Sequence, residues 1–142
     1  MQSKARLLVT VIVLATMTLS ACRAREPALG GKTWVLQSHG EPDDLQDVLE
    51  GTEITATFNT AKGEISGSAG CNSYFGSYQV NGSKLAIGPL AHTEMFCAAP
   101  EGVMEQEQQY LTVLTTAQSY EVRDGQLRVF CSGSQRLIFS AR

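Results

Sequence analysis

Apolar and polar residues alternate over much of the chain after residue 32, and a period of two predicts strands. Residues 54–58 alternate between apolar side chains and threonine. Residues 74–80 repeat the alternation and put Tyr74 and Tyr78 on the same face. Such segments have the pattern of half-buried strands, with one face on a core and the other in water.

Turn sequences rich in glycine separate these strands. Asn81-Gly82 favours a type I′ hairpin between 74–80 and a return strand at 85–87. Ala61-Lys62-Gly63 can likewise turn the strand 54–58 back into 64–67. Further strands are expected at 33–37, 120–122, 127–129 and 137–139, with Asp124-Gly125 joining the second and third of these four.

A single segment has helical spacing instead. Pro100 suits a first helical position, and Glu101 beside it suits the positive end of a helix. An apolar stripe follows at helical spacing: Val103, Met104, Tyr110, Leu111, Leu114 and Ala117. The other face of this helix carries Glu105, Glu107 and Gln108. We expect the stripe to pack against the sheet.

Residues 32–142 are therefore expected to form one α+β domain. Its strands form an antiparallel sheet or small open barrel of about seven to eight short strands, packed by one amphipathic helix. Residues 39–51 are rich in Asp and Glu and are expected to form a solvated loop. They lack the spaced oxygen ligands of a calcium loop of the EF-hand type.

The first 21 residues have the pattern of an export signal rather than of the fold. Lys4 and Arg6 precede an uncharged stretch at 7–21, which at about 1.5 Å per residue spans roughly 22 Å, short of a membrane core of about 30 Å. The stretch ends in Leu19-Ser20-Ala21-Cys22, which resembles a bacterial lipobox. This resemblance implies cleavage before Cys22 and acylation of its thiol. The alternative is an ordinary leader cut after small residues.

The residues after Cys22 predict how the domain is held. The segment 22–31 is short, polar and broken by Pro27 and by Gly30-Gly31, as expected for a tether. Two or three acyl chains on Cys22 would anchor it stably in a lipid membrane. By resemblance to lipoproteins of two-membrane bacteria, Arg23 after the acylated cysteine favours the outer membrane, with the domain facing the periplasm.

Composition and charge exclude several classes of protein. The 142 residues are 43% hydrophobic and 18% charged, values typical of a globular chain rather than a disordered one. The net charge is −3, and removal of Lys4 and Arg6 with the leader leaves nine basic against fourteen acidic residues, about −5. We therefore expect no nucleic-acid partner, because binding phosphates requires clustered Lys and Arg.

Three cysteines remain once Cys22 is acylated, and they permit one disulfide in three pairings. We favour Cys71 with Cys97, because both lie in loop-like sequence flanked by Gly or Pro. This bridge would close a loop of about 27 residues and stabilise the domain by roughly 3.5 kcal/mol. Cys131 lies in a strand pattern and is expected to be a small core residue. A zinc site of the three cysteines and His92 has no close cysteine pair to nucleate it, so we expect no metal and no cofactor.

The chain resembles the META domain, also called the HslJ-like heat-shock family, over most of residues 32–142. The matching segments are Lys32-Thr33-Trp34, residues 54–58, the glycine-rich run 65–78, Thr93-Glu94-Met95 with Cys97, and the helix with Met104, Glu105 and Glu107. Of these segments, residues 67–78 are the most specific to the family. Phe96 stands where the family commonly has a second methionine-like residue, and Cys131 is outside the pattern. The resemblance implies an envelope lipoprotein linked to stress tolerance and names no reaction.

The Gly70-Cys71-Asn72 motif has two interpretations. In the structural one, Gly70 supplies an unusual backbone angle, Cys71 a bridge, and Asn72 a turn made through its own side-chain hydrogen bonds. In the functional one, the residues around it form a surface for a partner, since Tyr and Phe offer large contact areas. The residues of that candidate surface are Asn72, Ser73, Tyr74, Phe75 and Tyr78.

Three functions remain open. The leading hypothesis is a non-enzymatic envelope lipoprotein that binds another envelope protein or a small apolar molecule. The alternative is an inhibitor of a secreted protease or lysozyme, which would present an exposed rigid loop at residues 73–77. A thiol enzyme would need Cys71 or Cys97 as a free thiolate beside His92 and Glu94. We expect no catalytic residues.

Overall fold

The computed structural model describes residues 29–142. The predicted signal peptide, Cys22 and the tether as far as residue 28 lie outside the described residues. Within 29–142, no helix has both the length and the apolar character needed to cross a membrane.

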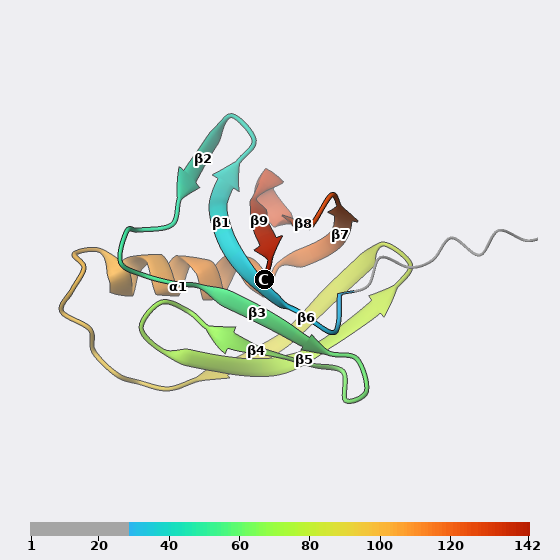
Figure 1. Ribbon diagram of the computed structural model, residues 1–142, viewed down its shortest axis with the longest axis horizontal. Coiled ribbons are helices and arrows are strands. Elements are labelled where there is room, and N and C mark those ends of the chain that lie inside the picture. Colours follow the sequence, from blue (N-terminus) through green and yellow to red (C-terminus); the bar gives the residue numbers. More distant parts are fainter. Residues whose placement is uncertain (1–28) are drawn as a thin grey trace, which may run out of the picture.

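The domain is a barrel of antiparallel strands with one helix packed on it (Figure 1). Its elements follow in chain order as β1 (Thr33–Glu41), β2 (Asp44–Asp47), β3 (Thr55–Asn59), β4 (Glu64–Ser68), β5 (Ser73–Asn81), β6 (Lys84–His92), α1 (Val103–Leu114), β7 (Ala117–Arg123), β8 (Gln126–Cys131), a short 3₁₀ turn (Ser132–Ser134) and β9 (Arg136–Ala141). This confirms the predicted strand-rich α+β fold with one helix.

Pairing between the first and last strands closes the barrel. The sheet runs from β1 through β3 to β9, each strand antiparallel to the next, and β1 also pairs with β9. One seam is weak, because β6 and β7 share a single residue pair, Lys84 with Ser119. Helix α1 follows β6 and precedes β7 in the chain. The unpaired part of β6 is therefore the end of the strand that leads to the helix.

The period of two in the sequence corresponds to the burial of alternate side chains. In β5, Tyr74 and Tyr78 are buried while Ser73, Phe75 and Ser77 are exposed, and β8 and β9 alternate in the same way. Trp34 is fully buried, and its indole Nε1 donates a hydrogen bond to the carbonyl oxygen of Leu29 at 2.9 Å. The buried faces form one core inside the barrel.

The helix begins later than the sequence predicted, and its polar face is not all in water. Gly102, with a left-handed φ of +85°, immediately precedes Val103, the first helical residue, so Pro100 is not a first helical position. The predicted stripe is buried at Val103, Tyr110 and Leu114, but Ala117 already belongs to β7. Glu107, assigned to the polar face, is only 4% exposed, because a turn of the barrel covers it.

The acidic segment 39–51 was expected to be a loop, and this prediction was wrong in part. Strand β1 continues to Glu41 and pairs with β2, Asp44–Asp47. All four side chains of β2 are exposed, as expected for a solvated segment. Because neither face of β2 is buried, its sequence carries no alternation from which a strand could be predicted.

Candidate functional site

The Cys71–Cys97 disulfide joins the turn after β4 to the loop between β6 and α1. The sulfur atoms of Cys71 and Cys97 are bonded to each other, which confirms the favoured pairing. Cys131 is the free cysteine of the described chain and is buried in β8, as predicted for a core residue. Burial raises the pKa of its thiol to about 11, so it is protonated at neutral pH.

The Asn72 side chain holds the loop and the helix together. Its Nδ2 donates to the carbonyl oxygen of Met95 at 3.0 Å and to Oε1 of Glu107 at 2.6 Å. Its Oδ1 accepts hydrogen bonds at 2.7 Å from Oγ1 of Thr93 and from the backbone N–H of Met95. The prediction that Asn72 turns the chain through local bonds was wrong, because its side chain bonds distant segments. Gly70 does have the predicted unusual angle, with a φ of +115°.

Glu107 completes this buried polar cluster from the helix. Its Oε2 accepts the backbone N–H groups of Cys71 at 3.1 Å and Asn72 at 2.6 Å. With the bond from Asn72 Nδ2, the carboxylate has three donors and needs no cation to satisfy its oxygens. Gln106 joins the helix to a second segment of the chain. Its Oε1 accepts the backbone N–H of Leu49, and its Nε2 donates to the hydroxyl of Thr52.

The candidate partner surface on β5 is largely wrong. Asn72, Tyr74 and Tyr78 are buried, so a partner cannot reach these side chains in the folded domain. The Tyr74 hydroxyl donates to the carbonyl oxygen of Thr55 at 2.9 Å and shares a 2.8 Å hydrogen bond with the Tyr110 hydroxyl. Burial raises the pKa of both phenols. Ser73 and Phe75 remain exposed, Phe75 by 64%.

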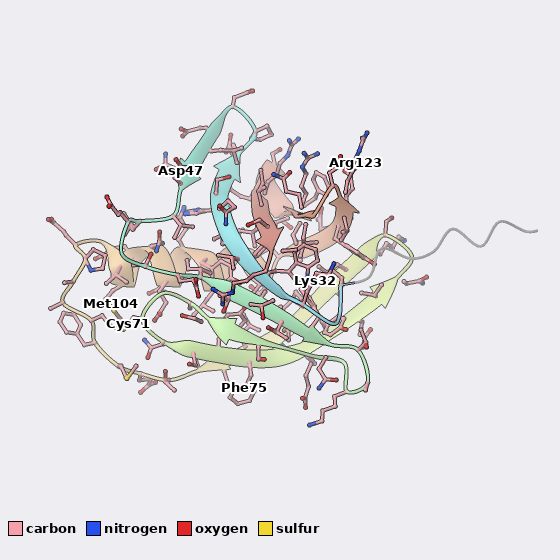
Figure 2. All side chains as sticks on the ribbon, viewed as in Figure 1. Lys32, Asp47, Cys71, Phe75, Met104 and Arg123 are labelled. Atoms are coloured by element: carbon pink, nitrogen blue, oxygen red, sulfur yellow. A yellow bond between two sulfur atoms is a disulfide. The ribbon has the colours of Figure 1, made fainter. Side chains whose placement is uncertain are left out.

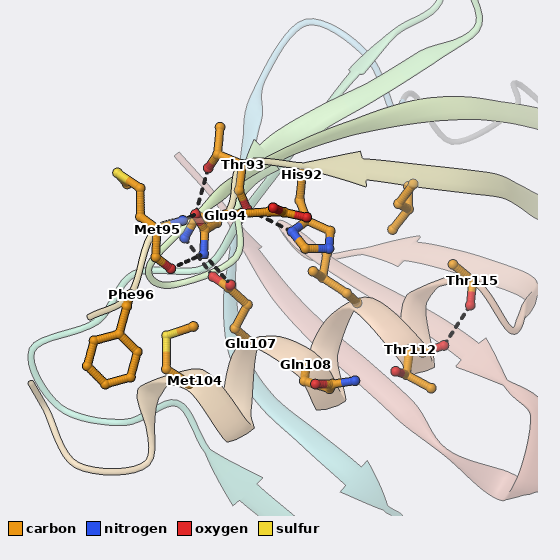
Figure 3. A pocket seen from close by; sticks show the side chains of 13 residues that line it. His92, Thr93, Glu94, Met95, Phe96, Met104, Glu107, Gln108, Thr112 and Thr115 are labelled. Atoms are coloured by element: carbon orange, nitrogen blue, oxygen red, sulfur yellow. Dashed lines mark hydrogen bonds between the residues drawn. The ribbon is translucent and has the colours of Figure 1, made fainter. Parts of the chain in front are cut away.

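An open groove lies between α1 and the end of β6 (Figure 3). Its volume is about 580 Å³, within the usual range for ligand sites. The strand side supplies residues from Leu90 to Phe96, and the helix side residues from Met104 to Thr115. Asn72 and Glu107 also line the groove, so the buried polar cluster forms part of its wall.

The groove carries exposed apolar side chains. Phe96 is 81% exposed and Met95 56% exposed, and Leu90, Met104 and Leu111 beside them are only partly buried. The loop that carries them is held by the disulfide, by Asn72 and by a 3.5 Å contact from the Cys97 N–H to the Met104 sulfur. Sequence reasoning did not single out this site. Its signal in the sequence was the adjacent pair of bulky apolar residues, Met95-Phe96, in a segment with no strand or helix pattern.

The disulfide contradicts both a thiol enzyme and a zinc site at these cysteines. Cys71 and Cys97 are bonded to each other, so neither is a free thiolate and neither can ligate zinc together with His92. The His92 Nδ1 lies 2.8 Å from the carbonyl oxygen of Thr93. No cluster of three or more His, Cys, Asp or Glu side chains suited to a metal ion occurs within residues 29–142.

The comparison with protein families settles the resemblance. A family model described as META domain matches residues 27–142, which include the whole barrel, the disulfide and the groove. The chain belongs to the META domain family. A search of the curated proteins found no match to this META domain.

Solved structures support the same fold. An NMR structure of a protein from Burkholderia xenovorans is 31% identical, with a TM-score of 0.67, covering 80% of this chain and 83% of that one. A second NMR structure, at 23% identity and a TM-score of 0.59, covers 79% and 90% of the two chains. A DUF4847 family protein from Bacteroides vulgatus, at 14% identity and a TM-score of 0.56, covers 79% and 93%. The latter two show the fold alone.

Proposed function

We propose that this META domain is a non-enzymatic binding module of the bacterial cell envelope that contributes to stress tolerance, and that the groove beside α1 is its binding site. The observation that carries the proposal is the exposure of Phe96 and Met95 on a loop that is firmly held. Exposed apolar side chains gathered at a hollow are typical of binding sites. A loop braced by a disulfide and by Asn72 binds without a large entropic cost of ordering.

The position of the groove suits a domain tethered at its N-terminus. Lys32 lies near the start of the described chain, and Met104 lies at the groove; Figure 2 shows the two well apart. If acyl chains on Cys22 anchor the protein in the outer membrane, the groove is accessible from the periplasm. Intact-mass spectrometry of membrane-extracted protein tests the anchor, with a diacylglyceryl adduct on Cys22 as the expected result. An unmodified cysteine, or cleavage at another site, would contradict it.

Photo-crosslinking in living cells tests the binding function. A photoreactive phenylalanine analogue replaces Phe96 in one strain and Phe75 in another, since both are exposed phenylalanines and only Phe96 lines the groove. We expect a discrete crosslinked partner from position 96 that position 75 does not give. Equal patterns from the two positions, or no adduct from position 96 under heat or envelope stress, would overturn the proposal.

Inhibition of a secreted hydrolase is the second candidate function. Residues 73–77 cannot be the predicted blocking loop, because they lie in β5 and pair with β4 and β6. Phe96 on its disulfide-braced loop is the feature that favours an inhibitor, since it projects a rigid apolar side chain. Micromolar protein assayed against a panel of proteases and lysozymes tests this function. Full residual activity of every enzyme would exclude inhibition of that panel.

A further inference from the structure

The backbone along the groove is an open sheet edge. Strand β6 pairs with β5 along most of its length but with β7 only through Lys84, so its second edge has no strand partner within residues 29–142 beyond that point. An unpaired edge presents free N–H and C=O groups that an extended peptide can bind. Residues Leu90 and His92 of this strand line the groove.

The loop after β6 continues this edge. The N–H of Thr93 donates to the carbonyl oxygen of Ser73, and both backbone groups of Met95 bond to the Asn72 side chain. The backbone groups of Glu94 and Phe96 make no hydrogen bond with other described residues. In extended chain, successive residues direct their backbone groups to opposite sides. Glu94 and Phe96 therefore leave the side away from β5 free.

Charge around the groove has one sign. Glu94 lines it, and Glu101 and Glu105 line an adjoining hollow of about 410 Å³ that shares Phe96 and Met104 with the groove. Neither hollow is lined by Lys or Arg, and the sequence has none from residue 85 to 122. The two ion pairs of the described chain, Arg123–Asp124 and Arg142–Glu53, do not involve these glutamates. A cationic occupant is therefore favoured, and an anionic one is repelled.

We infer that the groove binds an extended, basic and apolar peptide segment of a partner protein, which adds a strand to the open edge of β6 and pairs its Lys or Arg side chains with Glu94, Glu101 and Glu105. The inference rests on the proposed binding function and names the class of partner. Alternate side chains of an added strand point in opposite directions. Apolar side chains on one face can therefore contact Phe96, Met104 and Leu111 while basic ones reach the rim. Met95 and Met104 line the groove, and their flexible thioether side chains can adapt to apolar side chains of different shape.

Binding of a designed peptide tests this inference. The probe is a fluorescent, end-capped heptapeptide of alternating lysine and leucine, titrated by anisotropy against the full chain in nanodiscs of zwitterionic lipid. We expect saturable binding that weakens as salt is added. Alternating glutamate and leucine, alternating lysine and serine, and the probe with N-methylated leucines should each bind at least about tenfold more weakly. Equal binding of the N-methylated peptide would overturn the added strand, and equal binding of the glutamate peptide would overturn charge selection.

Matched variants place the binding in the groove. The triple variant Glu94→Gln, Glu101→Gln, Glu105→Gln and the single variant Phe96→Ser should each weaken binding about tenfold. Phe75→Ser and Glu64→Gln, which alter exposed residues outside the groove, should change it by less than about twofold. Thermal unfolding checks that each variant is folded. Equal loss in the control variants would overturn the inference.

The two proposals can fail separately. A partner crosslinked from position 96, together with no preference among the peptides, would leave the binding function standing and overturn the peptide class. Absence of both would overturn both. A crosslink between two copies of the chain, with no peptide binding, would identify self-association as the use of the groove and overturn the peptide inference.

Discussion

Of the two short segments joined by the Cys71–Cys97 disulfide, one buries a polar side chain and the other exposes an apolar one. In the turn after β4, Asn72 is 2% exposed, whereas Phe96 in the facing loop is 81% exposed. Every hydrogen-bonding atom of the Asn72 side chain has a partner within the domain. The ring of Phe96 fills no part of the core. The buried polar group is thus explained by the fold, and the exposed apolar group points to a function outside it.

Removal of the Asn72 side chain should have the largest effect on stability. Asn72→Ala breaks four hydrogen bonds and leaves the Glu107 carboxylate and the Met95 backbone short of partners. We expect a loss of about 3–5 kcal/mol in the free energy of unfolding, as for other broken buried networks. Urea denaturation followed by circular dichroism measures it. A loss below about 1 kcal/mol would show that the polar cluster does not hold the loop.

The disulfide joins the two regions, and its removal should rank second. The double variant Cys71→Ala, Cys97→Ala should lose about 3.5 kcal/mol of unfolding free energy, because the unfolded chain regains the entropy of an open loop. Reduction of the unmodified protein should reproduce that loss in the same urea titration. Amide exchange should also quicken in residues 93–99. Unchanged exchange there would show that Asn72 alone holds the loop.

His39 is the counterexample among buried polar groups and should give a smaller, pH-dependent effect. Its Nδ1 is buried and has no hydrogen-bond partner among residues 29–142, and desolvation lowers its pKa from the ordinary value of 6.5. The unfolded chain therefore binds the proton first, and the free energy of unfolding should fall as pH drops from about 7 to about 5. Thermal melts at several pH values measure this slope. His39→Leu should flatten this slope.

Phe96 should have the smallest effect on stability, although it is the largest exposed side chain of the groove. Phe96→Ala should change the free energy of unfolding by less than about 0.5 kcal/mol, because the ring has few contacts to lose. The same variant should lose binding of the lysine–leucine peptide. Melts and anisotropy on one preparation measure both quantities. A loss of stability above about 2 kcal/mol would assign the ring to the fold instead.

The alternation along residues 74–80 predicted the burial of side chains there better than the motif at Gly70-Cys71-Asn72 predicted a partner surface. Alternation along 74–80 already assigned Tyr74 and Tyr78 to one face, and the structure buries both. The predicted partner surface combined neighbouring residues of one motif. Neighbouring side chains in a strand point to opposite faces, so they cannot all be exposed on the same surface. Tyr74 therefore stabilises the core through Thr55 and Tyr110, and of the five candidate surface residues only Ser73 and Phe75 are exposed.

The helix shows why the polar cluster was not predicted. Its spacing identified the apolar stripe of Val103, Tyr110 and Leu114, and those residues are buried. Helical periodicity places Glu107 on the other face, but it does not say what covers that face. The turn carrying Cys71 and Asn72 covers it, and their N–H groups satisfy the carboxylate.

The sequence by itself determined most of the strands, most turns and the favoured disulfide, because alternation, glycine turns and cysteine context are local properties of the chain. It also predicted the domain class through its resemblance to META domains, which the family comparison confirms. Only the tertiary structure decided that Asn72 meets Glu107, 35 positions away, and that Met95 and Phe96 border an open groove. The physical reason is that burial depends on which distant segment packs opposite a residue, and barrel closure sets that packing.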